Sequence, residues 1–318
     1  MKQPFEKSDG SLSSGAVAPE VLVSSGMAIE LGDKRRLADY VELAKFRLSL
    51  LVLVVTAVGY CLGAESAIQV MGLFHVVLGT ALVAFAANAL NQYLERDLDR
   101  LMRRTADRPI PSGRMQPVEA LAFGIVSAAA GFVYLTILVN FLAGILAVVT
   151  LLLYIVVYTP LKRRTSLNTL AGAVPGAIPP MIGWVAARGR LDTTAWILFA
   201  ILFVWQLPHF FAIAWMYRED YARAGYRMIS LVDSNGAAIA RQTVFFTVVL
   251  LGVSLTPLVI GIAGVAYLVG AVFLGMLLLA VAVRFAADRT LVSARSLLVA
   301  SIMYLPLLMF LLLVARLA

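Results

Sequence analysis

Nine long apolar runs constrain the fold of this chain more than any other feature of its sequence. They lie at about 47–64, 69–93, 117–137, 140–159, 169–187, 194–217, 240–261, 264–284 and 296–315. Each run has the length, roughly 17 to 25 residues, that a helix needs to cross the hydrocarbon core of a bilayer. Unpaired backbone cannot face lipid, and the runs lack the alternation of barrel strands, so they predict helices. Only 14% of the residues are charged, against about a quarter in soluble domains, which also indicates a polytopic membrane protein.

The basic residues predict how these helices are oriented. If the N-terminal tail and the loops after every second run share one side, that side holds 23 of the 26 Lys and Arg. Only Arg188, Arg190 and Arg316 fall on the other side. By the positive-inside rule the N-terminus is then cytoplasmic and the C-terminus outside. The membrane is expected to be a bacterial plasma (inner) membrane. The net charge of +8 therefore reports topology, and no nucleic-acid partner is expected.

Two regions are expected along the chain. Residues 1–37 are rich in Ser, Gly and Ala and lack an apolar core followed by a cleavage site, so they predict a flexible cytoplasmic tail and no signal peptide. Residues 38–318 are expected to form one all-α transmembrane domain, in which about nine helices surround a central cavity open to the cytoplasmic side. Cys61 is the only cysteine, which excludes an intrachain disulfide and a Cys-based metal site.

An acidic motif ends the second apolar run. Asn91, Glu95 and Asp99 are spaced i, i+4, i+8 and share one face of a helix. Carboxylates at hydrocarbon depth are costly and are usually kept for ion or substrate chemistry. Arginines follow directly, and this mixture suits a divalent metal together with a polyanion. A simpler alternative stays open, in which the carboxylates pair with arginines of their own helix end, as Glu95–Arg100 or Asp99–Arg103.

Two more polar clusters lie on the predicted cytoplasmic side, at the ends of the fourth and sixth runs. Tyr158 and Lys162 are again i, i+4, so a phenol and an ammonium can converge. The third cluster comprises 205–209, with His209, and 217–221, with Asp220. Taken singly, the 162–164 charges are explained by topology and His209 by helix packing. Together the clusters favour Mg²⁺ held by carboxylates and bridging to phosphate oxygens, with cations neutralising the rest of a diphosphate.

These motifs resemble those of the UbiA superfamily of intramembrane prenyltransferases, and within it the heme-modifying branch. Asn91, Glu95 and Asp99 fall on the superfamily's Asn-x3-Asp-x3-Asp motif, and Asp97 matches an extra acid of the heme-modifying branch. The loop that carries Arg104 and Arg108, and the Tyr158-x3-Lys162 pair, are similar to the family's loop and diphosphate-binding pair. Segments that fit the heme-modifying branch in particular are Trp205-Gln-x-Pro-His209-Phe, Asp220-Tyr221 and Ser301-Ile-x-Tyr304. The resemblance covers about residues 38–316.

The chain departs from the family pattern at three positions. Glu95 replaces the usual Asp and is longer by one methylene, so its reach toward a metal differs. Phe46 stands where the family often has Pro, between the basic residues Lys45 and Arg47. The second acidic cluster of the superfamily is reduced to Asp220, with Met216 four residues earlier.

The resemblance implies a Mg²⁺-dependent transfer of the farnesyl group of farnesyl diphosphate to a vinyl group of heme B, which gives heme O and diphosphate. Heme is then a substrate and not a permanent cofactor, the membrane lipid surrounds the site, and a heme A synthase is a partner downstream. The implied metal ligands are Asn91, Glu95 and Asp99, with Asp97 as a further ligand only if the helix unwinds near its end. The implied diphosphate-binding residues are Lys162, Tyr158, Lys45 and Arg47, and the implied heme contacts are His209, Arg104, Arg108, Arg218 and Asp220.

Three other functions remain as alternatives. A prenyltransferase for a phenolic acceptor in quinone synthesis shares the first two clusters, but the Trp-Gln-x-Pro-His segment argues against it. A transporter with intramembrane carboxylates predicts polar residues near the bilayer midplane, whereas the clusters here lie at helix ends. A heme-binding assembly protein without catalysis is supported only by His209.

Overall fold

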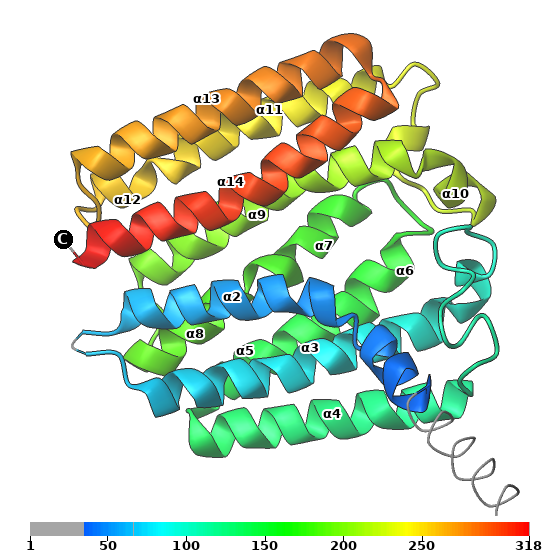
Figure 1. Ribbon diagram of the computed structural model, residues 1–318, viewed down its shortest axis with the longest axis horizontal. Coiled ribbons are helices and arrows are strands. Elements are labelled where there is room, and N and C mark those ends of the chain that lie inside the picture. Colours follow the sequence, from blue (N-terminus) through cyan, green and yellow to red (C-terminus); the bar gives the residue numbers. More distant parts are fainter. Residues whose placement is uncertain (1–34, 66, 318) are drawn as a thin grey trace, which may run out of the picture. The chain divides into compact units, whose positions relative to one another are not determined.

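The computed structural model describes residues 35–65 and 67–317, and within these residues it is helical and contains no strand (Figure 1). The expected tail, 1–37, falls almost wholly outside the described residues, and 35–43 are helical. Val41–Ala318 packs as one compact unit. Its elements are α2 (Phe46–Gly63), α3 (Val70–Asp99), α4 (Pro117–Leu138), α5 (Phe141–Leu152), η1 (Leu153–Tyr158), α6 (Thr159–Leu161), α7 (Asn168–Ala177), α8 (Pro179–Arg188), α9 (Thr193–Met216), α10 (Arg218–Arg223), η2 (Ile229–Leu231), α11 (Ala237–Ser254), α12 (Thr256–Val259), α13 (Val265–Asp288) and α14 (Leu291–Leu317).

The prediction of an all-α membrane protein with nine spans is confirmed for the described residues. Nine helical stretches there are long and apolar enough to cross a bilayer, and they coincide with the nine apolar runs within a few residues. Three stretches consist of consecutive short elements: α5–η1–α6, α7–α8 and α11–α12. The second stretch differs most from its apolar run, because α3 continues to Asp99 and includes the whole acidic motif.

The helices of Val41–Ala318 pack in two groups. In Figure 1 the helices α2, α3, α4, α5 and α8 lie together in the lower half, and α9, α11, α13 and α14 lie together in the upper half. One buried apolar cluster lies mainly among α9, α11, α13 and α14 and also includes residues of α2, α7 and α8, and a second lies among α2, α3, α4, α5 and α8. Helices α2 and α8 approach closely because each places a glycine against the backbone of the other. Gly59 of α2 faces Pro180, and Gly183 of α8 faces Thr56, where a Cβ would overlap the carbonyl oxygen.

Irregular backbone interrupts the fourth and fifth spans. Residues Leu153–Tyr158 form the π-helical turn η1, and such turns frequently mark functional positions. Pro175 and Pro179 flank the break between α7 and α8, because proline lacks the N–H that would continue the helical bonds. The π-helical turn directly precedes Thr159–Leu161, the end of the fourth span.

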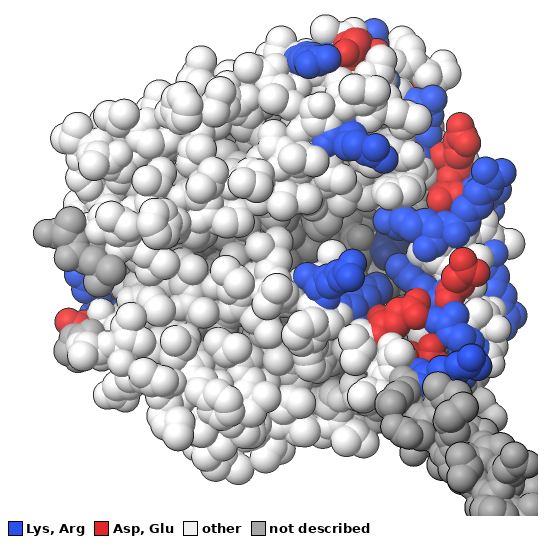
Figure 2. Space-filling view, viewed as in Figure 1, with Lys and Arg blue, Asp and Glu red and all other residues white. Residues whose placement is uncertain are grey.

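Charged side chains gather at one end of the bundle, which Figure 2 shows as the right-hand edge. We call this the charged end; it comprises the end of α3 and the segments 100–116, 162–167 and 217–236. At the opposite end, Arg188 pairs with Glu65. Figure 2 also shows the surface hollowed beside the basic side chains of the charged end.

Candidate active site

The acidic motif forms a buried polar face on the last turns of α3. Asn91, Glu95 and Asp99 are 2%, 5% and 1% exposed. The i, i+4, i+8 spacing keeps them on one side of an unbroken helix. Asp97 points elsewhere: its side chain is 73% exposed and lies near Arg96 and Arg100. The unwound helix end that would bring Asp97 into the site is absent, because α3 is intact through Asp99.

Glu95 pairs with a cation from the fourth span and not with an arginine of its own helix. The Lys162 ammonium donates to both carboxylate oxygens of Glu95, at 2.8 and 2.9 Å. Burial opposes the charge on Lys162, yet Glu95 and the nearby Tyr158 hold the pKa of Lys162 well above its ordinary value. The Lys162 ammonium also lies 4.6 Å from the centre of the Tyr158 ring, a cation–π distance. The predicted convergence of Tyr158 and Lys162 is therefore present, at the acidic face.

Asp99 receives its cation from the turn that follows α3. Segment 100–116 folds back because Met102, Ile110 and Met115 are buried, and the Thr105 hydroxyl donates to the Asp99 carbonyl at 2.8 Å. This turn places Arg108 Nη1 2.7 Å from Asp99 Oδ2. Asp99 Oδ1 is also buried but accepts no hydrogen bond from the described residues.

Asn91 links the acidic face to η1. Its amide donates to the Thr159 hydroxyl at 3.2 Å, and that hydroxyl donates to the Tyr154 carbonyl at 2.9 Å. The last turn of the fourth span is thereby held against α3. Thr159 was not among the residues singled out from the sequence, since a threonine beside a proline gives no signal of its own.

Lys45 reaches the same site from the turn before α2. The amide of Gln92 donates to the Leu43 carbonyl at 2.7 Å, and the amide of Asn88 donates to the Ala44 carbonyl at 3.0 Å. These bonds hold Lys45 in the left-handed region, with φ of 46°, a conformation rare outside glycine. The predicted partner Arg47 is exposed.

Lys45 lies near enough to the acidic cluster for the charges there to affect its pKa. Burial foremost, and then the Arg108 and Lys162 charges, lower the pKa of Lys45 to about 7, against the opposing effect of Glu95 and Asp99. The site therefore holds two carboxylates and three basic side chains, and it carries an excess of positive charge when Lys45 is protonated. Such an excess suits a bound polyanion.

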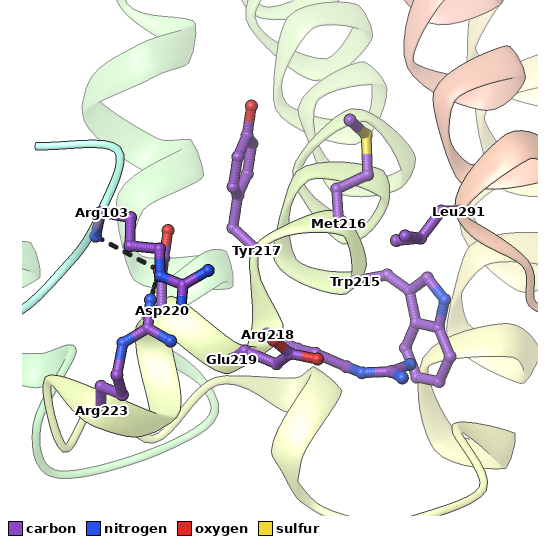
Figure 3. A pocket seen from close by; sticks show the side chains of 9 residues that line it. All are labelled: Arg103, Trp215, Met216, Tyr217, Arg218, Glu219, Asp220, Arg223 and Leu291. Carbon is purple, nitrogen blue, oxygen red and sulfur yellow. Dashed lines mark hydrogen bonds and ion pairs between the residues drawn. The ribbon is translucent and has the colours of Figure 1, made fainter.

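The third predicted cluster forms a separate region of the charged end. A cavity of about 200 Å³ opens there, lined by residues of α9, α10, segment 100–116 and Leu291 (Figure 3). Asp220 lies between two arginines: it accepts from the Arg103 backbone N–H at 3.3 Å and pairs with the Arg223 side chain. The guanidinium of Arg218 packs on the Trp215 ring at 4.3 Å. Asp220 therefore joins α10 to segment 100–116.

Arg104 and His209 also have defined surroundings. The guanidinium of Arg104 lies 4.5 Å from the Tyr217 ring centre and donates to the Tyr221 hydroxyl at 3.2 Å. His209 Nδ1 lies 2.9 Å from the Ser301 hydroxyl of α14, and the imidazole stacks on Trp205 at 5.0 Å. Arg108, by contrast, belongs to the acidic site through Asp99.

The acidic face fits a Mg²⁺ ion with few protein ligands. Within the described residues no group of three or more His, Cys, Asp or Glu side chains could hold a metal ion. Mg²⁺ is commonly held by one or two carboxylates together with substrate phosphates and water. The site matches that pattern, because it offers two buried carboxylates and the Asn91 amide. One of the carboxylate oxygens, on Asp99, is buried and accepts no hydrogen bond from the described residues.

Comparisons with known proteins define the class. Residues 52–314 match the model of the UbiA prenyltransferase family. The chain therefore belongs to the UbiA prenyltransferase family. It is 48% identical to the protoheme IX farnesyltransferase of Solibacter usitatus (strain Ellin6076), over 87% of this chain and 98% of that protein. It is 41% identical to the protoheme IX farnesyltransferase of Koribacter versatilis (strain Ellin345), over 86% and 91%. The resemblance to the heme-modifying branch is confirmed.

Solved structures confirm the fold. A digeranylgeranylglyceryl phosphate synthase superimposes with a TM-score of 0.73 at 17% identity, over 89% of this chain and 99% of that one. A UbiA homologue from Archaeoglobus fulgidus, bound to GPP and Mg²⁺, superimposes with a TM-score of 0.58 at 13% identity, over 87% and 99%. At such identities the likeness extends to the fold alone.

Proposed function

We propose that this protein transfers the farnesyl group of farnesyl diphosphate to a vinyl group of heme B, giving heme O and diphosphate, with Mg²⁺ as the metal. The observation that carries the proposal is the buried convergence of Asn91, Glu95 and Asp99 with cations from three other segments. Support for the acceptor comes from relatives that are protoheme IX farnesyltransferases. Support for the donor and metal comes from the Archaeoglobus neighbour bound to GPP and Mg²⁺.

Asn91, Glu95 and Asp99 would hold the Mg²⁺ ion. When bound, the ion supplies electrostatic stabilisation of the departing diphosphate. The chain's own cations do the rest of this work: Lys162, Arg108 and Lys45 bind phosphate oxygens and stabilise the leaving charge. In the described structure two of them neutralise Glu95 and Asp99, so they are already in place.

The reaction follows from this charge arrangement. The C–O bond of farnesyl diphosphate breaks heterolytically, its electron pair leaves with diphosphate, and an allylic cation remains. The heme vinyl group attacks this cation, and water adds to the new cation at the vinyl carbon with loss of a proton. Tyr158 and the apolar helix faces exclude bulk water from the first cation.

The acceptor half is proposed to lie at α9 and α10. His209 contacts either the heme iron or the porphyrin edge, and Arg104 and Arg218 contribute to propionate recognition, while Asp220 holds α10 against segment 100–116. Nδ1 of His209 is already hydrogen-bonded to the Ser301 hydroxyl, so a contact to heme would use Nε2. A His209→Ala variant that retains full heme binding and turnover would contradict both roles.

One experiment tests the function directly. Purified protein in nanodiscs is incubated with heme B, farnesyl diphosphate and Mg²⁺, and the products are analysed for the mass of heme O. Asp99→Asn is expected to abolish product while the protein still inserts. Product from a phenolic acceptor and none from heme B would establish the quinone-type alternative instead.

The membrane placement is part of the proposal. The charged end faces the cytoplasm of a bacterial plasma membrane, with the N-terminus inside and the C-terminus outside, because 23 of the 26 Lys and Arg then lie inside. The central cavity between the helices is proposed to open toward the cytoplasm. A heme A synthase is expected to consume the product, heme O. A cysteine introduced at Arg316, with Cys61 replaced by serine, is expected to react with an impermeant reagent only from outside.

A further inference from the structure

Tyr226, in the loop after α10, carries a buried hydroxyl that the proposed mechanism does not use. The residue is only 4% exposed. Its hydroxyl is buried and makes no hydrogen bond with the described residues. A buried polar group without a partner destabilises a folded protein, and each such group in a native structure calls for an explanation.

The hydroxyl belongs to the diphosphate half of the site. The Lys162 ammonium lies 5.8 Å from the centre of the Tyr226 ring. Burial foremost, and then the Glu95 carboxylate, raise the pKa of Tyr226. The phenol therefore stays protonated and remains a hydrogen-bond donor.

Backbone bonds, and not the hydroxyl, hold Tyr226 in this place. The N–H of Arg227 donates to the Lys162 carbonyl at 2.8 Å. The Asn168 amide donates to the carbonyls of Arg227 and Thr165, at 2.8 and 2.7 Å. The loop is thus fastened to the turn that carries Lys162, and the Tyr226 hydroxyl is free to serve a ligand.

Glu95 is a poor candidate for the missing partner. Both of its carboxylate oxygens already accept from Lys162; the Tyr226 hydroxyl lies near enough to Glu95 for this carboxylate to help raise the pKa of the phenol, but no hydrogen bond of ordinary geometry joins the two side chains. A diphosphate that recruits Lys162 brings several strong acceptor oxygens to the same place. We propose that Tyr226 is a substrate-binding residue whose hydroxyl donates a hydrogen bond to an oxygen of the bound diphosphate. The proposal rests on the proposed function, because it takes the Lys162–Glu95 site as the diphosphate site.

The variant Tyr226→Phe removes only the hydroxyl. Because that hydroxyl is unsatisfied in the free protein, its loss is expected to leave the melting temperature unchanged or to raise it. Binding of inorganic pyrophosphate with Mg²⁺, measured by calorimetry on the full chain in nanodiscs, is expected to weaken roughly tenfold or more, as for a lost bond to a charged group. Farnesyl diphosphate is expected to lose the same factor, since the prenyl chain is not contacted.

Tyr267→Phe is the matched control. Tyr267 is 1% exposed, and its hydroxyl donates to the Ser254 carbonyl at 2.7 Å. This variant is expected to lower the melting temperature and to leave pyrophosphate affinity unchanged. The two tyrosines thus predict opposite patterns of stability and binding.

Three results would overturn the proposal. Unchanged pyrophosphate affinity in Tyr226→Phe shows that the hydroxyl does not contact the anion, whatever the melting temperature. A loss seen only with farnesyl diphosphate moves the contact to the prenyl chain. A wild-type protein that binds neither ligand refutes the diphosphate site itself, and with it the proposed function, whereas the first two results leave that function intact.

Discussion

Replacing Lys162 with methionine tests how strongly the buried pair with Glu95 shapes the site. The ammonium lies 2.8 and 2.9 Å from the two carboxylate oxygens, and the side chains are only 13% and 6% exposed. At an effective dielectric constant of about 20, unit charges this close attract by roughly 6 kcal/mol, and desolvation offsets much of that. Removing one partner leaves a buried, uncompensated carboxylate, so Lys162→Met is expected to destabilise the protein by about 3–5 kcal/mol.

A double-mutant cycle isolates this effect. Adding Glu95→Gln to Lys162→Met removes the orphaned charge and is expected to recover most of the lost stability, with a coupling of about 3 kcal/mol. Stability is measured by reversible unfolding in mixed micelles with increasing dodecyl sulfate. The exposed neighbour Arg163 is the control, since Arg163→Met is expected to change stability by less than about 0.5 kcal/mol. Additive single effects would show that the pair is solvated and that the argument from burial is wrong.

Two predictions concern the turn that carries Lys45. Gln92→Leu removes the donor to the Leu43 carbonyl, so it is expected to lower the free energy of unfolding by about 1–3 kcal/mol and to weaken farnesyl diphosphate binding. The control is Thr247→Val, which also removes a buried hydrogen bond but lies on α11. This control should lower stability without changing the affinity for farnesyl diphosphate. Because the pKa of Lys45 is lowered to about 7 in the free protein, a bound anion should raise it and draw a proton at pH 8 but not at pH 6. Calorimetry in two buffers of different ionisation enthalpy measures this proton uptake, and the affinity for the anion should fall as the pH rises above 7. The uptake should vanish in Lys45→Met. If Lys45→Met takes up as many protons as the wild-type protein, the assignment to Lys45 is wrong.

The spans were predictable because lipid removes most choices. A helix is the one way for an isolated apolar run to satisfy its backbone in hydrocarbon, and the nine runs therefore coincide with the nine helical stretches found in the described residues. The shared face of Asn91, Glu95 and Asp99 was predictable for a similar reason, since helix periodicity alone places them together.

The partners of those residues were not predictable from local spacing. The sequence left open the pairs Glu95–Arg100 and Asp99–Arg103, but the observed cations are Lys162 and Arg108. The helix ends at Asp99, so residues beyond it no longer follow its period. Asn88 and Gln92 gave no signal either, because their role is to bond the backbone of a turn more than 40 positions away in sequence.

The sequence by itself therefore determined the class of protein, the number of spans and the acidic face, since each depends on composition or on a period along one helix. Only the tertiary structure decided which cations neutralise that face, how Lys45 reaches it, and that Tyr226 brings a hydroxyl to it without a partner. Those contacts join segments that are distant in the chain, through irregular turns and backbone hydrogen bonds. Their geometry depends on how the helices pack, which no periodicity along a single helix encodes.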